Sequence, residues 1–443
     1  MSLNEAWRRR SLASVWHPCT QMKLHESDGV PLVPIARADG VWLHDHDGRR
    51  ILDGISSWWV NLFGHNHPAI RAALVEQLQT LDHVMLAGFT HAPVVELSER
   101  LAALTGLGHA FYGSDGASAT EIALKMSAHH WRNAGRPEKN RFVGVAGGYH
   151  GETVGALGVT DIALFRDAYA PLLRRAATVP SPDARQAAPG EDAAAVAERA
   201  AAALEAHLAE HAAQTAALIV EPLVQCAAGM AMHHPLYLQR VRALCERHEV
   251  HLVLDEIAVG FGRTGTLFAH QQAGIRPDFL CLSKGLTGGT LPLSVVLTTD
   301  AVYDTFYDDA VARGFLHSHS YTGNPLACRA ALATLELFER HDTIAANRLS
   351  AQRLAAQFEP LSRHPRVRHA RRQGLIFAWD VADAPPGFAR RYARAALERG
   401  ALLRPIGSTV YAMPPYVIDV AEGQHLADAA LGALQAALDG DGV

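Results

Sequence analysis

The sequence lacks several features that would place it in well-known protein classes. No apolar run is long enough to cross a membrane, and the opening segment MSLNEAWRRRSLASVW has no signal-peptide core. The five cysteines are scattered and odd in number, and the 25 histidines include no H-E-x-x-H spacing. The net charge of −5 gives no indication of nucleic-acid or membrane binding. We therefore expect a cytoplasmic protein without a metal site.

The composition is that of a chain with a large buried core. Hydrophobic residues make up 49% and charged residues 19%, which excludes a disordered protein, and the length predicts two or three domains. Between about Leu101 and Thr299, short apolar runs alternate with helical patterns. The runs are Ala110–Tyr112, Arg141–Val145, Ala217–Val220, His251–Leu254, Phe279–Leu282 and Leu293–Leu297; the helical patterns include Ala117–Trp131 and Pro235–His248. This alternation predicts an α/β fold with a mainly parallel sheet covered on both faces.

The ends of the chain predict a second, smaller domain of the α+β class. From about Arg366 onward come the strand-like GLIFAWDV, a helical span Phe388–Arg399, and a last helix. Strand-like pieces at Val41–Leu43 and Arg50–Leu52 are expected to pair with this block. The predicted organisation is an N-terminal segment (1–65) that joins the small domain, a large α/β domain (66–330), and a C-terminal small domain (331–443).

A lysine and an acid follow two of the predicted buried strands. Asp255-Glu256 ends the run HLVL, and Lys284 follows the run FLCLS. Ligands of parallel sheets gather beyond the carboxyl ends of the strands, so both side chains are expected at one edge. Chemistry based on pyridoxal 5′-phosphate (PLP) needs this pair: the lysine forms a Schiff base, and the carboxylate keeps the pyridine nitrogen protonated. Asp255 is preferred over Glu256 because it ends the strand, although a solvated strand end or a cap would also explain an acid here.

Two further segments follow predicted strands. Ser114-Asp115-Gly116-Ala117-Ser118 opens a predicted helix, whose first N–H groups form an anion site that Ala117 is small enough to leave accessible. An ordinary helix cap by Ser114 or Asp115 is the alternative. In the turn Gly147–Gly151, the ring of Tyr149 stands between glycines and could stack on a cofactor.

Gly260-Phe261-Gly262-Arg263-Thr264-Gly265 matches the G-x-G-x-x-G dinucleotide pattern and raises the alternative of an NAD-dependent oxidoreductase. The context does not fit, because five residues separate the preceding strand from the first glycine and two of them are acids that would repel a pyrophosphate. The segment that follows Gly265 is also a weak start for a helix.

Together, LDEIAVGFGRTG and PDFLCLSKGLTGG resemble the signature of the class III PLP-dependent aminotransferases. The resemblance implies the fold-type I architecture and a homodimer with active sites at the subunit interface. It assigns the Schiff-base link and the proton shuttle to Lys284, and the pyridine nitrogen to Asp255. It further implies phosphate binding by Gly116 and Ala117, phosphate contacts to the neighbouring subunit's site from His319 and Ser320, and stacking of Tyr149 on the ring next to the substrate.

A narrower resemblance comes from WHPCTQMKLHE, DGISSWWVNLFGHNHP, LTGGTLPLSVVLTT, HSHSYTGNPLAC and RPIGSTVYAMPPY. These segments resemble the members of the class that convert 8-amino-7-oxononanoate to 7,8-diaminononanoate in biotin biosynthesis, with S-adenosyl-L-methionine as amino donor. The resemblance implies that Trp58, Ser318 and Arg404 line the substrate pocket, and that Arg404 faces the substrate carboxylate, which a guanidinium binds bidentately. Because adjacent side chains of a strand point to opposite faces, only one of Trp58 and Trp59 is expected there.

The chain departs from some of these relatives at Cys19, where they carry a tyrosine that recognises both substrates. A cysteine cannot stack on an adenine ring. Lysine as the amino donor therefore stays an alternative, as does another ω-aminotransferase of the same class.

Overall fold

The computed structural model describes residues 1–25 and 29–439 and divides into two compact units. One unit comprises Met1–Pro68 and Ala345–Val443, and the other comprises Ala69–Ile344. The second boundary lies beyond the expected position 331 because α11 (Pro325–Arg340) packs on α4 (Ala92–Thr105) and on the 3-10 turn η6 (Lys284–Thr287) of the larger unit. Within the described ranges, no helix combines the length and apolarity that a membrane span requires.

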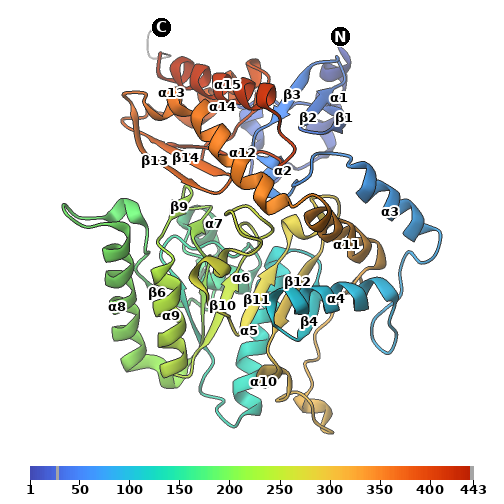
Figure 1. The fold of residues 1–443 in the computed structure, drawn as a ribbon, viewed down its shortest axis with the longest axis vertical. Coiled ribbons are helices and arrows are strands. Elements are labelled where there is room, and N and C mark those ends of the chain that lie inside the picture. The colour runs from blue at the N-terminus through green and yellow to red at the C-terminus, as the bar shows by residue number, and fades with distance from the viewer. Residues whose placement is uncertain (26–28, 440–443) are drawn as a thin grey trace. The chain divides into compact units, whose positions relative to one another are not determined.

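The larger unit is built on a seven-stranded sheet in the order β4-β12-β11-β10-β7-β5-β6 (Figure 1). All neighbouring pairs are parallel except the two that involve β12, which runs antiparallel to β11 and β4. Its strands are β4 (His109–Gly113), β5 (Arg141–Val145), β6 (Ala177–Val179), β7 (Thr215–Val220), β10 (His251–Asp255), β11 (Phe279–Leu282) and β12 (Ser294–Thr298).

Nearly every residue of the central strands is buried, as their continuous apolar runs require of a sheet covered on both faces. Helix α5 packs on β4, β7, β11 and β12, and α8 packs beside α9 (Figure 1). The helices of this unit are α3 (Pro68–Leu78, whose first residue belongs to the other unit), α4, α5 (Gly116–Asn133), α6 (Val154–Val159), α7 (Ala163–Arg166), α8 (Ala193–His211), α9 (Leu236–Arg247), α10 (Asp300–Tyr303) and α11.

The six predicted strands are all present, so the prediction of a mainly parallel α/β sheet is confirmed. The edge strand β6 was not predicted, because its three residues ATV are too few to carry a periodic signal. The antiparallel direction of β12 was not predicted either, since a buried apolar run looks the same in both directions.

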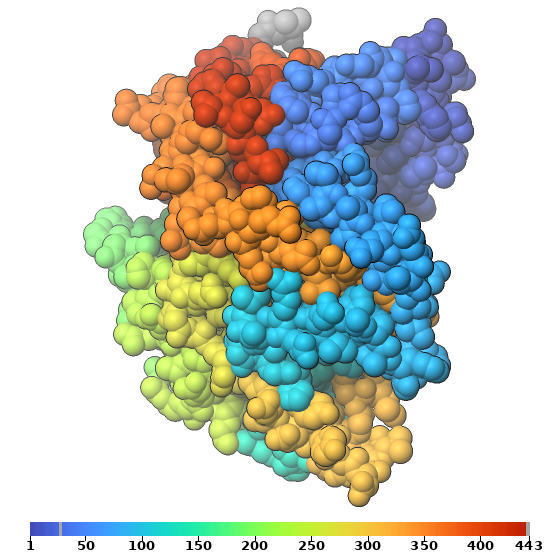
Figure 2. All heavy atoms as spheres, turned by 45° about the vertical axis from the view of Figure 1, so that its right-hand side comes forward, coloured from blue at the N-terminus to red at the C-terminus, as the bar shows by residue number. Residues whose placement is uncertain are grey.

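The smaller unit combines segments from both ends of the chain. Its four-stranded sheet has the order β1-β2-β3-β15, and its three-stranded sheet has the order β13-β14-β16. The parallel pairing of Leu52 in β3 with Ala401 in β15 confirms the expected association of the N-terminal strands with the C-terminal block. In Figure 2, the red surface of the C-terminal segment lies against blue surface of the N-terminal segment. The strands are β1 (Ile35–Asp39), β2 (Trp42–Asp45), β3 (Arg50–Asp53), β13 (Val367–Gln373), β14 (Ile376–Val381), β15 (Ala401–Leu402) and β16 (Thr409–Ala412); the helices are α1 (Leu3–Ser14), α2 (Ser56–Trp59), α12 (Thr343–Gln357), α13 (Glu359–Ser362), α14 (Phe388–Glu398) and α15 (Val420–Asp439).

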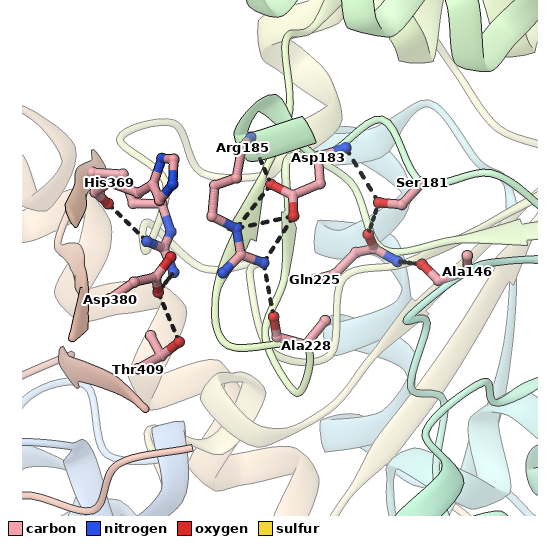
Figure 3. Close-up of polar contacts among 10 residues, drawn as sticks. Ala146, Ser181, Asp183, Arg185, Gln225, Ala228, His369, Asp380 and Thr409 are labelled. Carbon is pink, nitrogen blue, oxygen red and sulfur yellow. Dashed lines mark hydrogen bonds and ion pairs between the residues drawn. The ribbon is translucent and has the colours of Figure 1, made fainter. Parts of the chain in front are cut away.

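A partly buried polar contact links the three strands of the β13-β14-β16 sheet. The Asp380 carboxylate of β14 accepts hydrogen bonds from Arg371 of β13 (2.9 Å) and from the Thr409 hydroxyl of β16 (2.8 Å) (Figure 3). One carboxylate thus joins all three strands.

Candidate active site

Polar and charged residues of the larger unit gather at the carboxyl ends of its parallel strands. Asp255 is the last residue of β10 and pairs in register with Cys281 of β11. Lys284 follows β11 closely as the first residue of η6, with a left-handed backbone (φ 45°). The two residues therefore stand at the ends of neighbouring parallel strands, as the sequence predicted.

Lys284 lies in a buried environment rich in acids. Burial lowers the pKa of the Lys284 amine, and the negative charges of Asp255 and Glu221 act in the opposite direction. A lowered pKa increases the fraction of neutral amine, which is the nucleophilic and basic form. This environment suits a lysine that reacts rather than one that only pairs with an acid.

Both oxygens of Asp255 are held in place by groups of the same unit. His150 Nδ1 lies 2.8 Å from Oδ2, and the Ile257 N–H donates to Oδ1 at 3.0 Å. Both His150 and Asp255 are buried. Glu256 is used differently, because its carboxylate accepts hydrogen bonds from the N–H groups of Ala269 and His270. Asp255, and not Glu256, thus has a carboxylate held at the strand end beside the lysine.

Glu221 is a site residue that the sequence reasoning missed. It follows β7 directly and is buried, and its carboxylate accepts hydrogen bonds from the N–H groups of Tyr149 (3.0 Å) and Cys226 (3.1 Å). Burial raises the pKa of Glu221 to about 7. The signal was present, since Glu221 follows the buried run AALIV just as Asp255 ends HLVL.

The ordinary helix cap, one of the two alternatives drawn from the sequence, is present at the N-terminus of α5. Asp115 caps the helix through the Ser118 N–H (2.9 Å), while the N–H groups of Gly116 and Ala117 have no acceptor within the helix. The Ser114 hydroxyl lies 3.0 Å from His319 Nδ1, so His319 contacts the start of this helix within its own chain. Ser318 and Ser320 are exposed in a segment without regular structure.

Tyr149 lies in the loop between β5 and α6. Its hydroxyl donates to Glu152 (2.9 Å), and its ring lies 5.5 Å from that of Phe165. The start of this loop is held by a polar chain, in which the Gln225 amide donates to the Ala146 carbonyl (2.9 Å) (Figure 3). The chain continues from Gln225 through Ser181 and Asp183 to Arg185. The loop is thus tied to the buried interior of the unit.

The glycine segment 260–265 does not form a dinucleotide-binding turn. The Gly262 N–H donates to the Leu267 carbonyl (3.1 Å), and the Gly265 N–H donates to Gly262 (3.2 Å). The next helical element is the short 3-10 turn η5 (Ala269–Ala273) rather than an α-helix that could bind a pyrophosphate at its N-terminus. The geometry removes the basis of the dehydrogenase alternative.

In the smaller unit, Cys19, Trp58 and Arg404 line one pocket of about 440 Å³. The Arg404 guanidinium lies 5.2 Å from the centre of the Trp58 ring, and its Nη2 donates to the Cys19 carbonyl (3.4 Å). His17, His25 and Arg390 add further nitrogen groups, and no carboxylate belongs to the lining within the described ranges. The pocket is suited to an anionic ligand with an apolar chain.

Trp58 is presented by a left-handed turn, so the expectation of a strand was wrong here. Ser56, Ser57, Trp58 and Trp59 all have positive φ angles, between 46° and 73°. The fully buried Asp53 holds this turn, because its carboxylate accepts from the Ser57 N–H (2.9 Å) and the Ser57 hydroxyl (2.7 Å) and contacts His65 (2.9 Å). Trp58 is 42% exposed, whereas Trp59 is 6% exposed and packs in the core.

Known proteins resemble the chain over nearly its whole length. The family model described as "Aminotransferase class-III" matches residues 24–438. An adenosylmethionine-8-amino-7-oxononanoate aminotransferase of Helicobacter pylori is 42% identical over 94% of this chain and 95% of its own, and one of Synechococcus elongatus is 40% identical over 93% and 96%.

Solved structures agree with this relationship. The aminotransferase of the same name from Methanocaldococcus jannaschii has a TM-score of 0.90 at 33% identity, covering 97% of this chain and 99% of that one. A PLP-bound amine transaminase from an uncultivated Pseudomonas species also has a TM-score of 0.90, at 31% identity and with 95% and 98% covered. The chain therefore belongs to the class III aminotransferases, a family of enzymes whose cofactor is pyridoxal 5′-phosphate.

Proposed function

We propose that the strand-end site of the larger unit holds PLP, with Lys284 Nζ as its point of covalent attachment and Asp255 as the partner of the pyridine nitrogen. The chemistry of the residues fits this group. A buried amine with a lowered pKa suits the aldehyde carbon, and a carboxylate held on both oxygens suits a protonated ring nitrogen. The N–H groups of Gly116 and Ala117 suit the phosphate, and the Tyr149 ring suits the cofactor face. His319 and Ser320 are proposed to complete the phosphate site of a neighbouring subunit.

When bound, PLP supplies an electron sink for the carbon that carries the amino group. Once the incoming amine has displaced it, Lys284 Nζ would take a proton from that carbon in the first half-reaction and would deliver a proton to the carbon that receives the amino group in the second. Burial supports this role because it lowers the pKa of the amine and so increases its basic form at neutral pH. Asp255 holds a proton at the ring nitrogen, and His150 fixes the direction of that carboxylate.

The reaction that we propose is transamination of 8-amino-7-oxononanoate to 7,8-diaminononanoate, a step of biotin biosynthesis. The observation that carries the proposal is the placement of Lys284 and the buried Asp255 at the ends of neighbouring strands. The names of relatives at up to 42% identity give the substrate. The pocket of the smaller unit, which Cys19, Trp58 and Arg404 line, offers a guanidinium for the substrate carboxylate and apolar walls for its chain. Ser318 is proposed to add a polar contact to the same substrate.

S-adenosyl-L-methionine is the proposed amino donor, with lysine as the second candidate because Cys19 offers no ring for the adenine. The test is a half-reaction: cofactor-loaded enzyme is mixed with each amine in turn, and conversion to the pyridoxamine phosphate form is followed by absorbance. Conversion by S-adenosyl-L-methionine and subsequent amination of 8-amino-7-oxononanoate are expected. If neither amine converts the enzyme, the biotin-pathway assignment is wrong. If borohydride fixes no pyridoxyl group on Lys284, the cofactor assignment is wrong as well.

We further propose a cytoplasmic homodimer. Apolar side chains stand exposed on adjoining segments of the larger unit: Met85 and Phe89 on one, and Tyr321 on the other, where the Tyr321 ring lies 4.9 Å from His83. Exposed apolar patches of this kind favour a subunit interface. The buried thiols of Cys226, Cys245, Cys281 and Cys328 support a reducing compartment. Light scattering on the purified protein, and on Tyr321→Arg, tests the dimer.

A further inference from the structure

Glu121 of α5 makes contacts that its place on a helix surface does not explain. Its Oε1 accepts three hydrogen bonds from the next part of the fold: from the Thr153 hydroxyl (2.6 Å) and from the N–H groups of Gly155 (2.8 Å) and Ala156 (3.3 Å). Thr153 is the N-cap residue of α6, yet its own side chain makes no capping bond to that helix. A carboxylate from another element therefore caps α6.

A second contact lies on the same face of α5. Ala117 and Glu121 are four residues apart and so project from one side of the helix. A Cβ placed on Gly151 would stand 2.5 Å from Ala117 Cβ, which shows how closely the loop lies against the first turn of α5. A Cβ on Gly155 would stand 2.2 Å from Glu121 Oε2, so the carboxylate approaches the first turn of α6 where glycine leaves room.

These contacts fasten the loop that carries Tyr149. Its start is held through Ala146 by Gln225, and its centre through the Tyr149 N–H by Glu221. Its end at Gly151 and Thr153, and the first turn of α6 that follows, are held by α5 through Ala117 and Glu121. Ala117 also offers one of the first-turn N–H groups proposed to bind the cofactor phosphate. One face of α5 thus holds both the phosphate and the end of the loop.

We propose that Glu121 is a positioning residue that locks the Tyr149 loop onto the first turn of α5 and thereby sets the affinity for the cofactor. The proposal rests on the proposed function, because it takes the α5 N-terminus as the phosphate site. Without Glu121, three donors lose a charged acceptor, α6 loses its cap, and Tyr149 and Ala117 are no longer held in one geometry. Hydrogen bonds to charged groups are the stronger ones, so the loss is expected to be measurable.

The test compares Glu121→Ala, Glu121→Gln and Asp192→Ala, by equilibrium binding of PLP to the cofactor-stripped full chain and by hydrogen exchange of residues 147–156. Asp192 is the matched control, since it caps α8 through the Ala195 N–H (2.8 Å) far along the chain from these residues. We expect Glu121→Ala to weaken PLP binding about tenfold and to speed exchange in the loop, and Glu121→Gln, which keeps one acceptor, to weaken binding only about threefold. Asp192→Ala should lower the unfolding temperature without changing PLP affinity.

Thr153→Val provides a second route if Glu121→Ala does not fold, because it removes the hydroxyl that donates to Glu121 (2.6 Å) while Glu121 and the loop backbone stay in place. It should also weaken PLP binding and speed exchange. PLP affinity within about twofold of wild type in Glu121→Ala and Thr153→Val would overturn the proposal, as would equal losses in Glu121→Ala and Asp192→Ala. A wild-type chain that binds no PLP at Lys284 would instead contradict the proposed function.

Discussion

The strand-end site of the larger unit and the pocket of the smaller unit are built in different ways. Lys284, Asp255 and Glu221 stand where regular strands end, so a single topological rule brings them to one edge. Lys284 shares a left-handed φ of 45° with Cys19 and Trp58, but its place is set by the end of β11, whereas Cys19 and Trp58 stand in irregular segments that no strand end positions. The turn at Trp58 depends instead on the buried Asp53. The reactive groups therefore rest on the most regular part of the fold, and the proposed selective groups rest on its least regular part. This difference predicts that changes in the first site affect chemistry and changes in the second affect selectivity.

The largest effect is expected from Lys284→Ala. It removes the proposed attachment atom and the proton carrier together, so transamination should fall by about 10⁴-fold or more. Lys139→Ala is the control, because desolvation lowers the pKa of Lys139 to about 8, yet its ammonium donates to the Ala212 carbonyl (2.7 Å). Half-reaction rates and borohydride labelling measure both variants. If borohydride still fixed a pyridoxyl group on Lys284→Ala, the cofactor would be attached at another residue.

Glu221→Gln should change the pH dependence of stability. Since burial raises the pKa of Glu221 from 4.5 to about 7, the folded state binds this proton more tightly than the unfolded state. The stabilisation of the folded state by this proton is fully present below the Glu221 pKa of 4.5 in the unfolded state, and it is lost as pH rises through the folded pKa of about 7. Relative to Glu221→Gln, the wild-type unfolding free energy should therefore fall by about 3 kcal/mol between about pH 4.5 and pH 8.

Chemical denaturation across this range measures the difference. Glu198→Gln is the control with the opposite sign, because hydrogen bonding to Arg240 lowers the pKa of the exposed Glu198. A pH-independent difference between wild type and Glu221→Gln would show that Glu221 titrates alike in both states.

Asp53→Asn tests whether the Asp53 carboxylate positions Trp58 in the pocket of the smaller unit. In asparagine an NH2 group replaces Oδ2, and it cannot accept the hydrogen bond from the Ser57 hydroxyl, so the left-handed turn should be destabilised by about 2 kcal/mol. The KM for 8-amino-7-oxononanoate should rise more than kcat falls. Asp45→Asn removes a comparable turn carboxylate, which accepts from the Asp47 and Arg49 N–H groups, and should leave KM unchanged. Equal effects on KM and kcat in both variants would show that Asp53 has no specific part in substrate selection.

The smallest effect is expected from Arg404→Lys, which keeps the charge but loses the planar pair of donors. Catalytic efficiency with the carboxylate substrate should fall about tenfold, through KM. Arg399→Lys, in the same unit, is the control: among residues 1–25 and 29–439, the Arg399 guanidinium donates to the Ala395 carbonyl of α14 alone, and the variant should behave as wild type. An unchanged KM in Arg404→Lys would argue against a carboxylate at this position.

The parts of the molecule that the sequence predicts are those set by periodicity. Buried apolar runs predict the central strands, and an acid or a lysine directly after a run predicts the edge where Asp255 and Lys284 stand. The same rule could have found Glu221. His150 was not found, because its contact with Asp255 joins residues far apart in the chain. The turn at Trp58 was assigned to a strand because no glycine marks its positive φ angles. The turn is stabilised by the Asp53 carboxylate, which accepts from Ser57, and by the Ser56 hydroxyl, which donates to the distant Met413 carbonyl.

Gly151 and Gly155 show that a position can be intolerant to substitution without taking part in the reaction. Neither has a side chain to touch a ligand, yet any larger residue would meet α5 at 2.5 Å or less. In a saturation mutagenesis screen for growth without biotin, both positions should be as intolerant as reactive ones. Shortening the facing residue by Ala117→Gly should not restore growth of Gly151→Ala, because the added Cβ would still stand 2.8 Å from the Ala117 Cα and the Gly151 φ of 115° disfavours any side chain. Intolerance of this kind marks a backbone constraint rather than a chemical role.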